Sequence, residues 1–140
     1  MEIGEEKNKI ENEAKKLNID SRIFFLGIRN DVGELLSAMD LFILPSIYEG
    51  APLSLIEAQT NGIDAIVTSN ISKEVFINDN VIPLELIEEK WVNKIEECLA
   101  NEIKEEERKK MYKNVENQKY DILETANLFE NKYYYIGDQL

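Results

Sequence analysis

The stretch "LFILPSIYEGAPLSLIEAQTNGIDAIVTS", Leu41–Ser69, decides the fold class. It contains two apolar runs, Leu41–Ser46 and Ala65–Ser69, which are continuous rather than alternating, as expected for strands covered on both faces. Between them, Pro52–Asn61 follows a glycine turn and opens with proline, a residue preferred at the first position of a helix. This order predicts two parallel strands joined by a right-handed crossover, and therefore an α/β domain.

The rest of the chain extends the same pattern. Two further strands are predicted at Ile23–Gly27 and Val81–Leu84. The remaining predicted helices are Glu6–Leu17, Asp31–Met39 (capped by Asn30 or Asp31), Glu88–Asn101 with Trp91, Ile95, Cys98 and Leu99 as its apolar face, and Asp121–Tyr135. Glu105 and Lys109 stand at the i,i+4 spacing of a solvated helical face. Together these elements predict a Rossmann-like, mostly parallel sheet flanked by helices.

Composition limits the class of protein. The chain has 140 residues, 44% hydrophobic and 31% charged, which is typical of one soluble globular domain. No apolar run approaches the roughly 20 residues of a membrane span, and one cysteine, Cys98, cannot form an internal disulfide. We therefore expect a cytoplasmic protein without a membrane span, with the inner face of the membrane as a possible site of action.

Charge and residue types exclude several functions. The net charge of −12 argues against nucleic acid as a partner of this chain. Because the chain has no histidine, Ser-His-Asp triads and histidine-based general-base catalysis are excluded, as are most transition-metal sites. No two aspartates stand two residues apart, so a short acidic metal-binding pair is also missing. Any chemistry must come from carboxylates, lysines, backbone amides or the substrate itself.

Two carboxylates frame the glycine turn. Glu49 precedes Gly50, and Glu57 lies five residues beyond Pro52, roughly 7–8 Å along a helix at ~1.5 Å per residue. A helix N-terminus at the carboxyl edge of a parallel sheet favours an anion such as a phosphate. A carboxylate beside that phosphate is repelled unless it accepts hydrogen bonds from hydroxyls. One glutamate would then hold a sugar and the other the ribose of a nucleotide-sugar.

The stretch "FLGIRNDVGELLSAMDLFILPSIYEGAPLSLIEAQTNGIDAIVTSN" resembles the C-terminal nucleotide-binding half of retaining GT-B glycosyltransferases of family 4, or group 1. Glu49, seven residues and then Glu57 match the Glu-x7-Glu motif of that family. The segments "FLG", "LFILPS" and "IEAQTNG" stand in the family's order. The resemblance covers about Gly4–Val81, and Asp121–Tyr135 fits the family's C-terminal crossover helix. It implies a nucleotide-sugar-binding domain at 1–118 and a crossover-type helix at 119–140.

The resemblance implies a role for each matching residue. Glu49 contacts the hydroxyls of the donor sugar and is the catalytic candidate, whereas Glu57 binds the ribose. The other substrate-binding residues implied are Gly50, Ala51, Pro52 and Leu53 at the phosphates and Gly27 and Ile28 at the base. Enzymes of this family need neither metal nor cofactor, because the donor phosphate can take the proton of the acceptor. The implied reaction is retaining transfer of a hexose, expected to be UDP-linked, to a saccharide or lipid-linked acceptor in bacterial surface-polysaccharide synthesis.

The sequence also departs from the family pattern. Glu2 replaces the first glycine of the usual Gly-x-Gly turn, Asp64 stands where proline is common, and Asn70-Ile71 replaces a Gly-Gly pair. Almost no strand precedes the first glycine turn, so we expect that the N-terminal strands of the domain and the acceptor-binding domain are absent from this chain. The expected partners are then a nucleotide-sugar, a separate N-terminal domain and, through the exposed sheet edge, a second copy.

Other interpretations of these residues remain. Taken singly, Glu49 and Glu57 are more often a solvated turn and an exposed helix position, and only the full motif favours the donor site. Arg29 and Lys73 could supply positive charge to the donor, but each is more often a surface residue. A second functional hypothesis is a non-catalytic nucleotide-sugar-binding or partner subunit. A flavodoxin-like receiver domain is a weaker third, because Asp40 and Asp64 do not supply its acidic cluster.

Overall fold

A parallel sheet of three strands is the centre of the computed structural model, which describes residues 4–101 and 103–120. The strands are β1 (Leu41–Leu44), β2 (Asp64–Thr68) and β3 (Val81–Leu84). They lie in this order, with Leu41 opposite Asp64 and Ala65 opposite Val81. The predicted α/β class with a parallel sheet is therefore confirmed.

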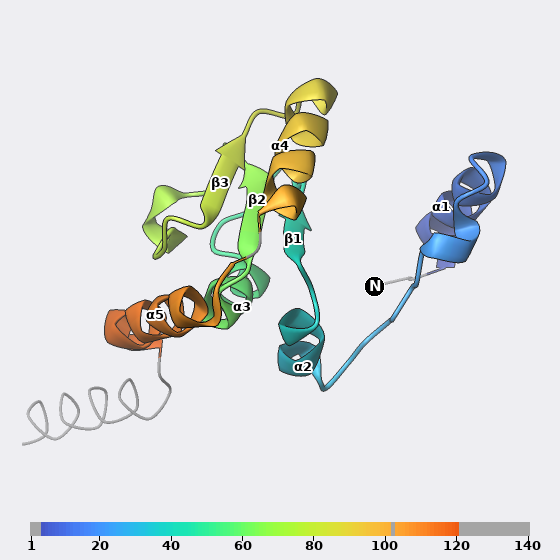
Figure 1. Cartoon of the computed structure of the whole chain (residues 1–140). Helices are drawn as coiled ribbons and strands as arrows, with labels where there is room; N and C mark the ends of the chain where they lie inside the picture. Colours follow the sequence, from blue (N-terminus) through green and yellow to red (C-terminus); the bar gives the residue numbers. More distant parts are fainter. Residues whose placement is uncertain (1–3, 102, 121–140) are drawn as a thin grey trace, which may run out of the picture. The chain divides into compact units, whose positions relative to one another are not determined.

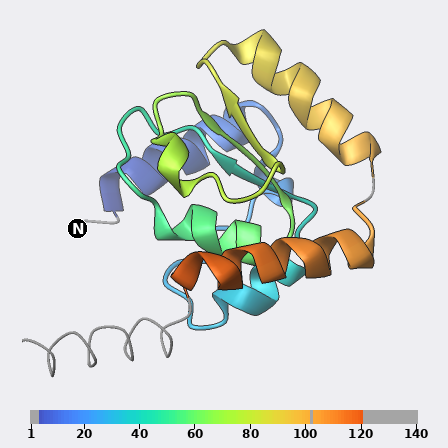
Figure 2. The ribbon, with the colours of Figure 1, turned by 90° about the vertical axis from the view of Figure 1, so that its left-hand side faces the viewer.

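Helices cover both faces of this sheet. Their bounds are α2 Val32–Ser37, α3 Leu53–Asn61, α4 Glu88–Ala100 and α5 Glu105–Val115, the last followed by a π-helical turn at Glu116–Tyr120. α4 packs on one face, whereas α3 and α5 lie side by side and pack on the other (Figure 1, Figure 2). Within residues 4–101 and 103–120, no helix is both long and apolar enough to span a membrane.

The central strand β2 is buried on both sides because its side chains alternate between two apolar clusters. Ile66 packs with Trp91 and Cys98 of α4. Ala65 and Val67 point the other way and pack with α3 and α5. All three β2 side chains are fully buried. Burial of each larger one contributes about 1.5–3 kcal/mol, so the apolar run of this strand accounts for much of the core.

Gly62 ends α3 and brings α5 close. Its φ of +67° lies in the left-handed region, where glycine carries no steric cost, and its N–H donates to the Gln59 carbonyl at 3.1 Å. A Cβ atom at this position would lie 2.6 Å from the Cα of Arg108. The absence of a side chain is thus what lets α5 pack against the end of α3.

The chain forms two compact units, Met1–Asn30 and Asp31–Leu140, and each is described by itself. The first unit contains α1 (Gly4–Lys16) and a short 3₁₀ turn, η1 (Asp20–Arg22). The predicted strand Ile23–Gly27 is wrong, since this segment runs without strand pairing. A strand needs a neighbour to satisfy its backbone groups, and no described segment of this unit provides one.

Several predicted details need correction. Pro52 is the N-cap of α3 rather than its first helical residue, because its ψ of 117° is extended. Leu99 does not belong to the buried face of α4, since it is 58% exposed, whereas Trp91 and Cys98 are buried. The predicted helix Asp121–Tyr135 lies outside the described residues, as does nearly all of the predicted segment 119–140.

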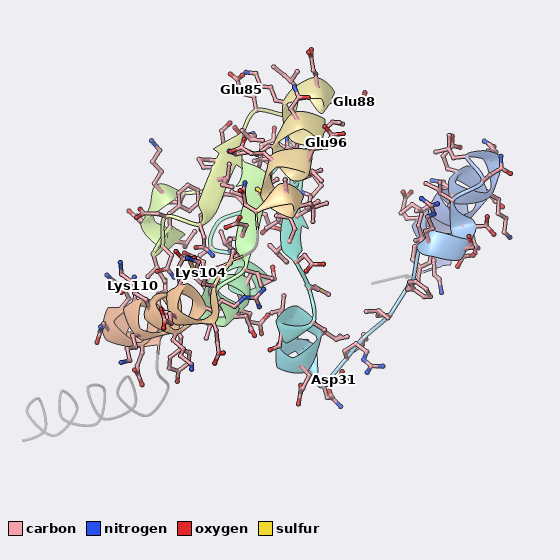
Figure 3. All side chains as sticks on the ribbon, viewed as in Figure 1. Asp31, Glu85, Glu88, Glu96, Lys104 and Lys110 are labelled. Carbon is pink, nitrogen blue, oxygen red and sulfur yellow. The ribbon has the colours of Figure 1, made fainter. Side chains whose placement is uncertain are left out.

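Charged side chains project from the outer helices α4 and α5. Figure 3 labels Glu88 and Glu96 on α4, Lys104 at the N-cap of α5 and Lys110 within α5. The predicted solvated face of α5 is confirmed by Glu105 and Lys109, which are exposed and form an ion pair of 2.6 Å. Exposed pairs of this kind contribute only about 0.3–0.5 kcal/mol each, so they favour solubility more than stability.

Candidate functional site

The loop between β1 and α3, together with the helix that follows it, carries the two carboxylates of the motif. It leaves β1 after Leu44 and enters α3 at Leu53. Glu49 is exposed on this loop, and its carboxylate accepts a hydrogen bond of 3.3 Å from the Ser46 hydroxyl. Because β1 is parallel to β2, the loop lies at the carboxyl edge of the sheet, where ligands of open α/β sheets commonly bind.

The start of α3 presents backbone donors beside Glu49. The first hydrogen bond of its opening turn runs from the Leu55 N–H to the Pro52 carbonyl at 3.1 Å. The N–H groups of Leu53 and Ser54 come before this bond, and N–H groups in such positions have no partner within their helix. Pro52 has no N–H, so it sets the backbone direction and donates nothing itself. Gly50 has open space at its Cβ position, which permits a close approach of a ligand to the backbone.

Glu57 lies on α3 just over one turn beyond this N-terminus. Its side chain is exposed, although its neighbours Ile56 and Ala58 are buried. It borders a largely apolar cavity of about 390 Å³ between α3 and α5. The other lining residues are Leu53, Ile56, Thr60, Tyr112, Val115, Glu116 and Tyr120. The predicted site residues Glu49 to Glu57 are thus continuous along one loop and the helix that follows it.

Gly27 and Ile28 belong to the first unit, so they are described apart from Glu49 and Glu57. Gly27 has φ +66°, a conformation that favours glycine, and no atom lies within 4 Å of its Cβ position. Ile28 is 89% exposed, which is unusual for a branched apolar side chain. Their predicted role at the base therefore stays a prediction.

Lys73, one of the two cations considered for the donor, begins the short 3₁₀ turn η2 (Lys73–Val75). The turn is capped by the Ser72 hydroxyl, which accepts the Glu74 N–H at 3.4 Å. Lys73 is exposed on this turn, which follows β2 at the same edge of the sheet as the Glu49 loop. The second cation, Arg29, lies in the first unit.

Three polar residues to which the sequence assigned no supporting role hold the loop and helix in place. Thr68 and Asn70, at the end of β2, donate hydrogen bonds to the carbonyls of Ser46 and Ile47. Gln59 of α3 is fully buried and bonds to the connection between β2 and β3. Gln59 could have been recognised as the polar side chain on an otherwise apolar helix face, because buried polar groups need partners.

A second polar cluster lies at the opposite edge of the sheet. Asp64 opens β2, and burial raises its pKa above 3.8, against the lowering effect of its hydrogen bond to Cys98 and the charges of Lys94 and Arg108. Burial also raises the pKa of the Cys98 thiol. A cavity of about 630 Å³ lies beside Cys98 and Arg108. This cluster is separated from the Glu49 loop by the length of the strands.

Comparison with known proteins places the fold and the motif in a family. A model of the family described as "Glycosyl transferases group 1" matches residues 3–118, most of the chain. The chain belongs to this family. The matched range includes the loop with Glu49, all of α3 with Glu57, and the three strands that position them.

Individual relatives match shorter segments of the chain. The UDP-Gal:alpha-D-GlcNAc-diphosphoundecaprenol alpha-1,3-galactosyltransferase of Escherichia coli is 48% identical over 56 residues, 40% of this chain and 14% of that protein. The lipopolysaccharide glucosyltransferase WaaG of Escherichia coli (strain K12) is 37% identical over 78 residues, 55% of this chain and 21% of that protein. The Vi polysaccharide biosynthesis protein VipC/TviE of Salmonella typhi is 44% identical over 75 residues, 53% of this chain and 13% of that protein. The matches thus cover about a fifth or less of the length of these relatives.

Proposed function

We propose that this chain is the donor-binding part of a retaining glycosyltransferase that transfers a hexose from a UDP-linked donor. The observation that carries the proposal is the placement of Glu49 and Glu57 on either side of the α3 N-terminus, within a segment matched by the group 1 family. A nucleotide-sugar has the hydroxyls of the sugar on one side of its phosphates and the hydroxyls of the ribose on the other. Glu49, the backbone amides at the start of α3, and Glu57 follow one another in the same order as the sugar, the phosphates and the ribose.

Each residue then has a defined role in donor binding. The Glu49 carboxylate accepts hydrogen bonds from the hydroxyls of the donor sugar. The backbone amides of Gly50, Ala51 and Leu53 bind the phosphates, helped by the positive end of the α3 dipole. The Glu57 carboxylate accepts hydrogen bonds from the ribose hydroxyls. Charge-assisted hydrogen bonds of this kind are roughly twice as strong as neutral ones, so both carboxylates favour a ligand rich in hydroxyls.

Catalysis in this proposal uses the substrate as its own base. The phosphate of the leaving group takes the proton of the acceptor hydroxyl on the face from which the sugar bond breaks, which retains the configuration at the sugar carbon. The contribution of the protein is to hold the donor and to orient the sugar through Glu49. Positioning of this kind can supply a large share of a rate enhancement, because it replaces the entropy lost in bringing the reactants together.

The relatives support the class of product. The names of three of them refer to a diphosphoundecaprenol-linked sugar, a lipopolysaccharide and a polysaccharide. We therefore propose a saccharide or lipid-linked acceptor, with the reaction at the cytoplasmic face of the membrane. The galactosyltransferase that uses UDP-Gal also supports a UDP-linked hexose.

A titration followed by NMR tests the proposal. The chain is titrated separately with UDP, ADP and GDP, and backbone amide shifts are recorded. We expect saturable shifts at Gly50–Glu57 with UDP and weaker or no shifts with the other two nucleotides. Saturable binding of UDP elsewhere, with no shifts at Gly50–Glu57, would contradict the proposed site.

A non-catalytic partner subunit is the second candidate function. It is favoured by the position of β1 at the edge of the sheet in the described part of the second unit, where Ile43 is 41% exposed. An unpaired strand edge is a common place for another chain to bind. The partner would be a separate N-terminal domain or a second copy of this chain. Hexose transfer to an acceptor by this chain alone would exclude this candidate.

A further inference from the structure

The connection between β2 and β3 contacts the candidate site at both of its ends. Thr68, the last residue of β2, lies beside the loop that carries Glu49 directly before the connection (69–80) begins, and Asn78, near the other end of the connection, lies beside α3. Its middle is held by Ile71, which is only 3% exposed within the main apolar cluster, and by the turn capped at Ser72. The connection is therefore a fixed support on which both parts of the site rest.

At its first end, the connection holds the backbone before Glu49. The Thr68 hydroxyl donates to the Ser46 carbonyl at 2.7 Å, and the Asn70 amide donates to the Ile47 carbonyl at 3.3 Å. The Ser46 hydroxyl in turn donates to the Glu49 carboxylate at 3.3 Å. The direction of the Glu49 side chain thus depends on where the start of the connection lies.

At its second end, the connection is fixed to α3 by Gln59. The amide nitrogen of this fully buried side chain donates to the Val75 carbonyl at 2.8 Å and to the Leu55 carbonyl at 3.3 Å. Its amide oxygen accepts the N–H groups of Ile77 at 2.8 Å and Asn78 at 3.0 Å.

A side-chain amide has two donor hydrogens and an oxygen with two lone pairs. The bonds of Gln59 use all four. An apolar residue of similar size would fill the same space but would leave the N–H groups of Ile77 and Asn78 buried without partners, which is costly. The choice of glutamine is therefore explained by the need to fix the connection, and packing alone does not require it.

We propose that Gln59 is a positioning residue for the donor site, acting through the β2–β3 connection on the loop that carries Glu49. The proposal rests on the proposed function of that loop in donor binding. Gln59 itself is buried and touches no substrate. Its loss would remove the hydrogen bonds that fix the connection to α3 and leave only apolar packing between them. The hydrogen bonds of Thr68 and Asn70 would then hold the Ser46–Ile47 backbone less firmly.

The substitution Gln59→Glu tests this proposal, because protonation of the new side chain should restore the hydrogen bond that its ionised form cannot donate. When ionised, the new carboxylate can still accept two N–H groups but has no proton to donate to the Val75 carbonyl. When protonated, it can donate that bond again. Burial favours the protonated form, whereas the N–H groups of Ile77 and Asn78 that point at the side chain favour the ionised form. Asn80→Asp is the matched control. Asn80 is also a buried amide, which donates to the Ile63 carbonyl, but it is the last residue of the connection, directly before β3 at the opposite edge of the sheet from the Glu49 loop.

The first measurement is ¹⁵N relaxation on the full chain at pH 7.5 and pH 5. In Gln59→Glu we expect the order parameters of Ile47–Glu49 to fall from about 0.85 to below about 0.6 at pH 7.5, and to recover at pH 5. Asn80→Asp should leave them unchanged at both pH values. Unchanged order parameters in Gln59→Glu at pH 7.5, or an equal fall in Asn80→Asp, would overturn the proposal. This result does not depend on any ligand.

The second measurement is the affinity of each variant for UDP and for UDP-galactose. We expect Gln59→Glu at pH 7.5 to lose roughly tenfold in affinity for UDP-galactose and much less for UDP, as for loss of one oriented hydrogen bond, with recovery at pH 5. Equal losses of affinity for both ligands would overturn the proposed role of Gln59 in orienting Glu49. If the wild-type chain binds neither ligand, the proposed function fails, while the relaxation data still decide whether Gln59 fixes the loop.

Discussion

Gly62 illustrates how one residue without a side chain determines the packing of two helices. We predict that Gly62→Ala lowers the free energy of unfolding by about 2–4 kcal/mol. The alanine backbone would be strained at a positive φ, and its Cβ atom would also clash with α5. The clash is with backbone, the Cα of Arg108 at 2.6 Å from the new Cβ, so no side-chain movement relieves it. Urea unfolding followed by circular dichroism measures the change.

The control is Gly33→Ala in α2. No atom lies within 4 Å of a Cβ at Gly33, which lies within the helix. Alanine is preferred over glycine inside a helix by about 0.5–1 kcal/mol, so this variant should be as stable as the wild type or slightly more so. A Gly62→Ala variant that unfolds at the same urea concentration as Gly33→Ala would disprove the close packing of α3 and α5.

The raised pKa of Asp64 predicts that the free energy of unfolding depends on pH. Because burial raises its pKa in the folded protein above 3.8, its contribution to stability is fully present below the unfolded pKa and is lost as pH rises through the folded pKa. Asp64→Asn removes this loss. We therefore expect Asp64→Asn to be more stable than the wild type at pH 7, with the difference shrinking toward pH 3. Urea unfolding at several pH values measures it. A wild-type advantage that grows with pH would mean that Lys94 and Arg108 outweigh burial.

Single residues were predictable where a motif or a backbone requirement defined them. The spacing of Glu49 and Glu57 around a glycine turn was visible in the sequence, and the structure places Glu49 on the loop between a strand and a helix and Glu57 on that helix. Gln59 was not recognised, because its role depends on Val75, Ile77 and Asn78, which are distant in sequence.

At the scale of elements, α3 is held to the sheet by one side of its surface. Leu55 is fully buried in the main cluster, whereas Leu53 is 74% exposed. We predict that Leu55→Ala lowers the free energy of unfolding by about 2–5 kcal/mol, because it removes buried surface and leaves a cavity. Leu53→Ala on the same helix should change it by less than about 0.5 kcal/mol. Urea unfolding measures both, and similar losses in the two variants would contradict the packing of α3.

The elements that were predicted correctly have local signals that agree with their surroundings. β1, β2 and β3 are apolar runs with neighbours on the sheet, so tertiary contacts reinforce their preference. Ile23–Gly27 has the same composition but no strand partner among the described residues of its unit, and it does not form a strand. Composition alone could not reveal this, because strand formation depends on a neighbour elsewhere in the chain.

At the scale of the whole molecule, the family match and the fold support each other. The matched range 3–118 contains the complete sheet of the described residues and the loop with Glu49. The chain spans about a fifth or less of the relatives that it matches. The nature of the acceptor therefore could not be derived from these residues, since nothing in the described site is specific for it.

The measurement that tests the central claim most directly compares Glu49→Gln and Glu57→Gln by calorimetry with UDP and with UDP-galactose. Both substitutions keep the size of the side chain and remove its charge. We predict that Glu57→Gln weakens binding of both ligands about tenfold, because both contain the ribose. Glu49→Gln should weaken only UDP-galactose, because only that ligand contains the sugar. Equal effects of the two substitutions on UDP would contradict the assignment of Glu49 to the sugar and Glu57 to the ribose.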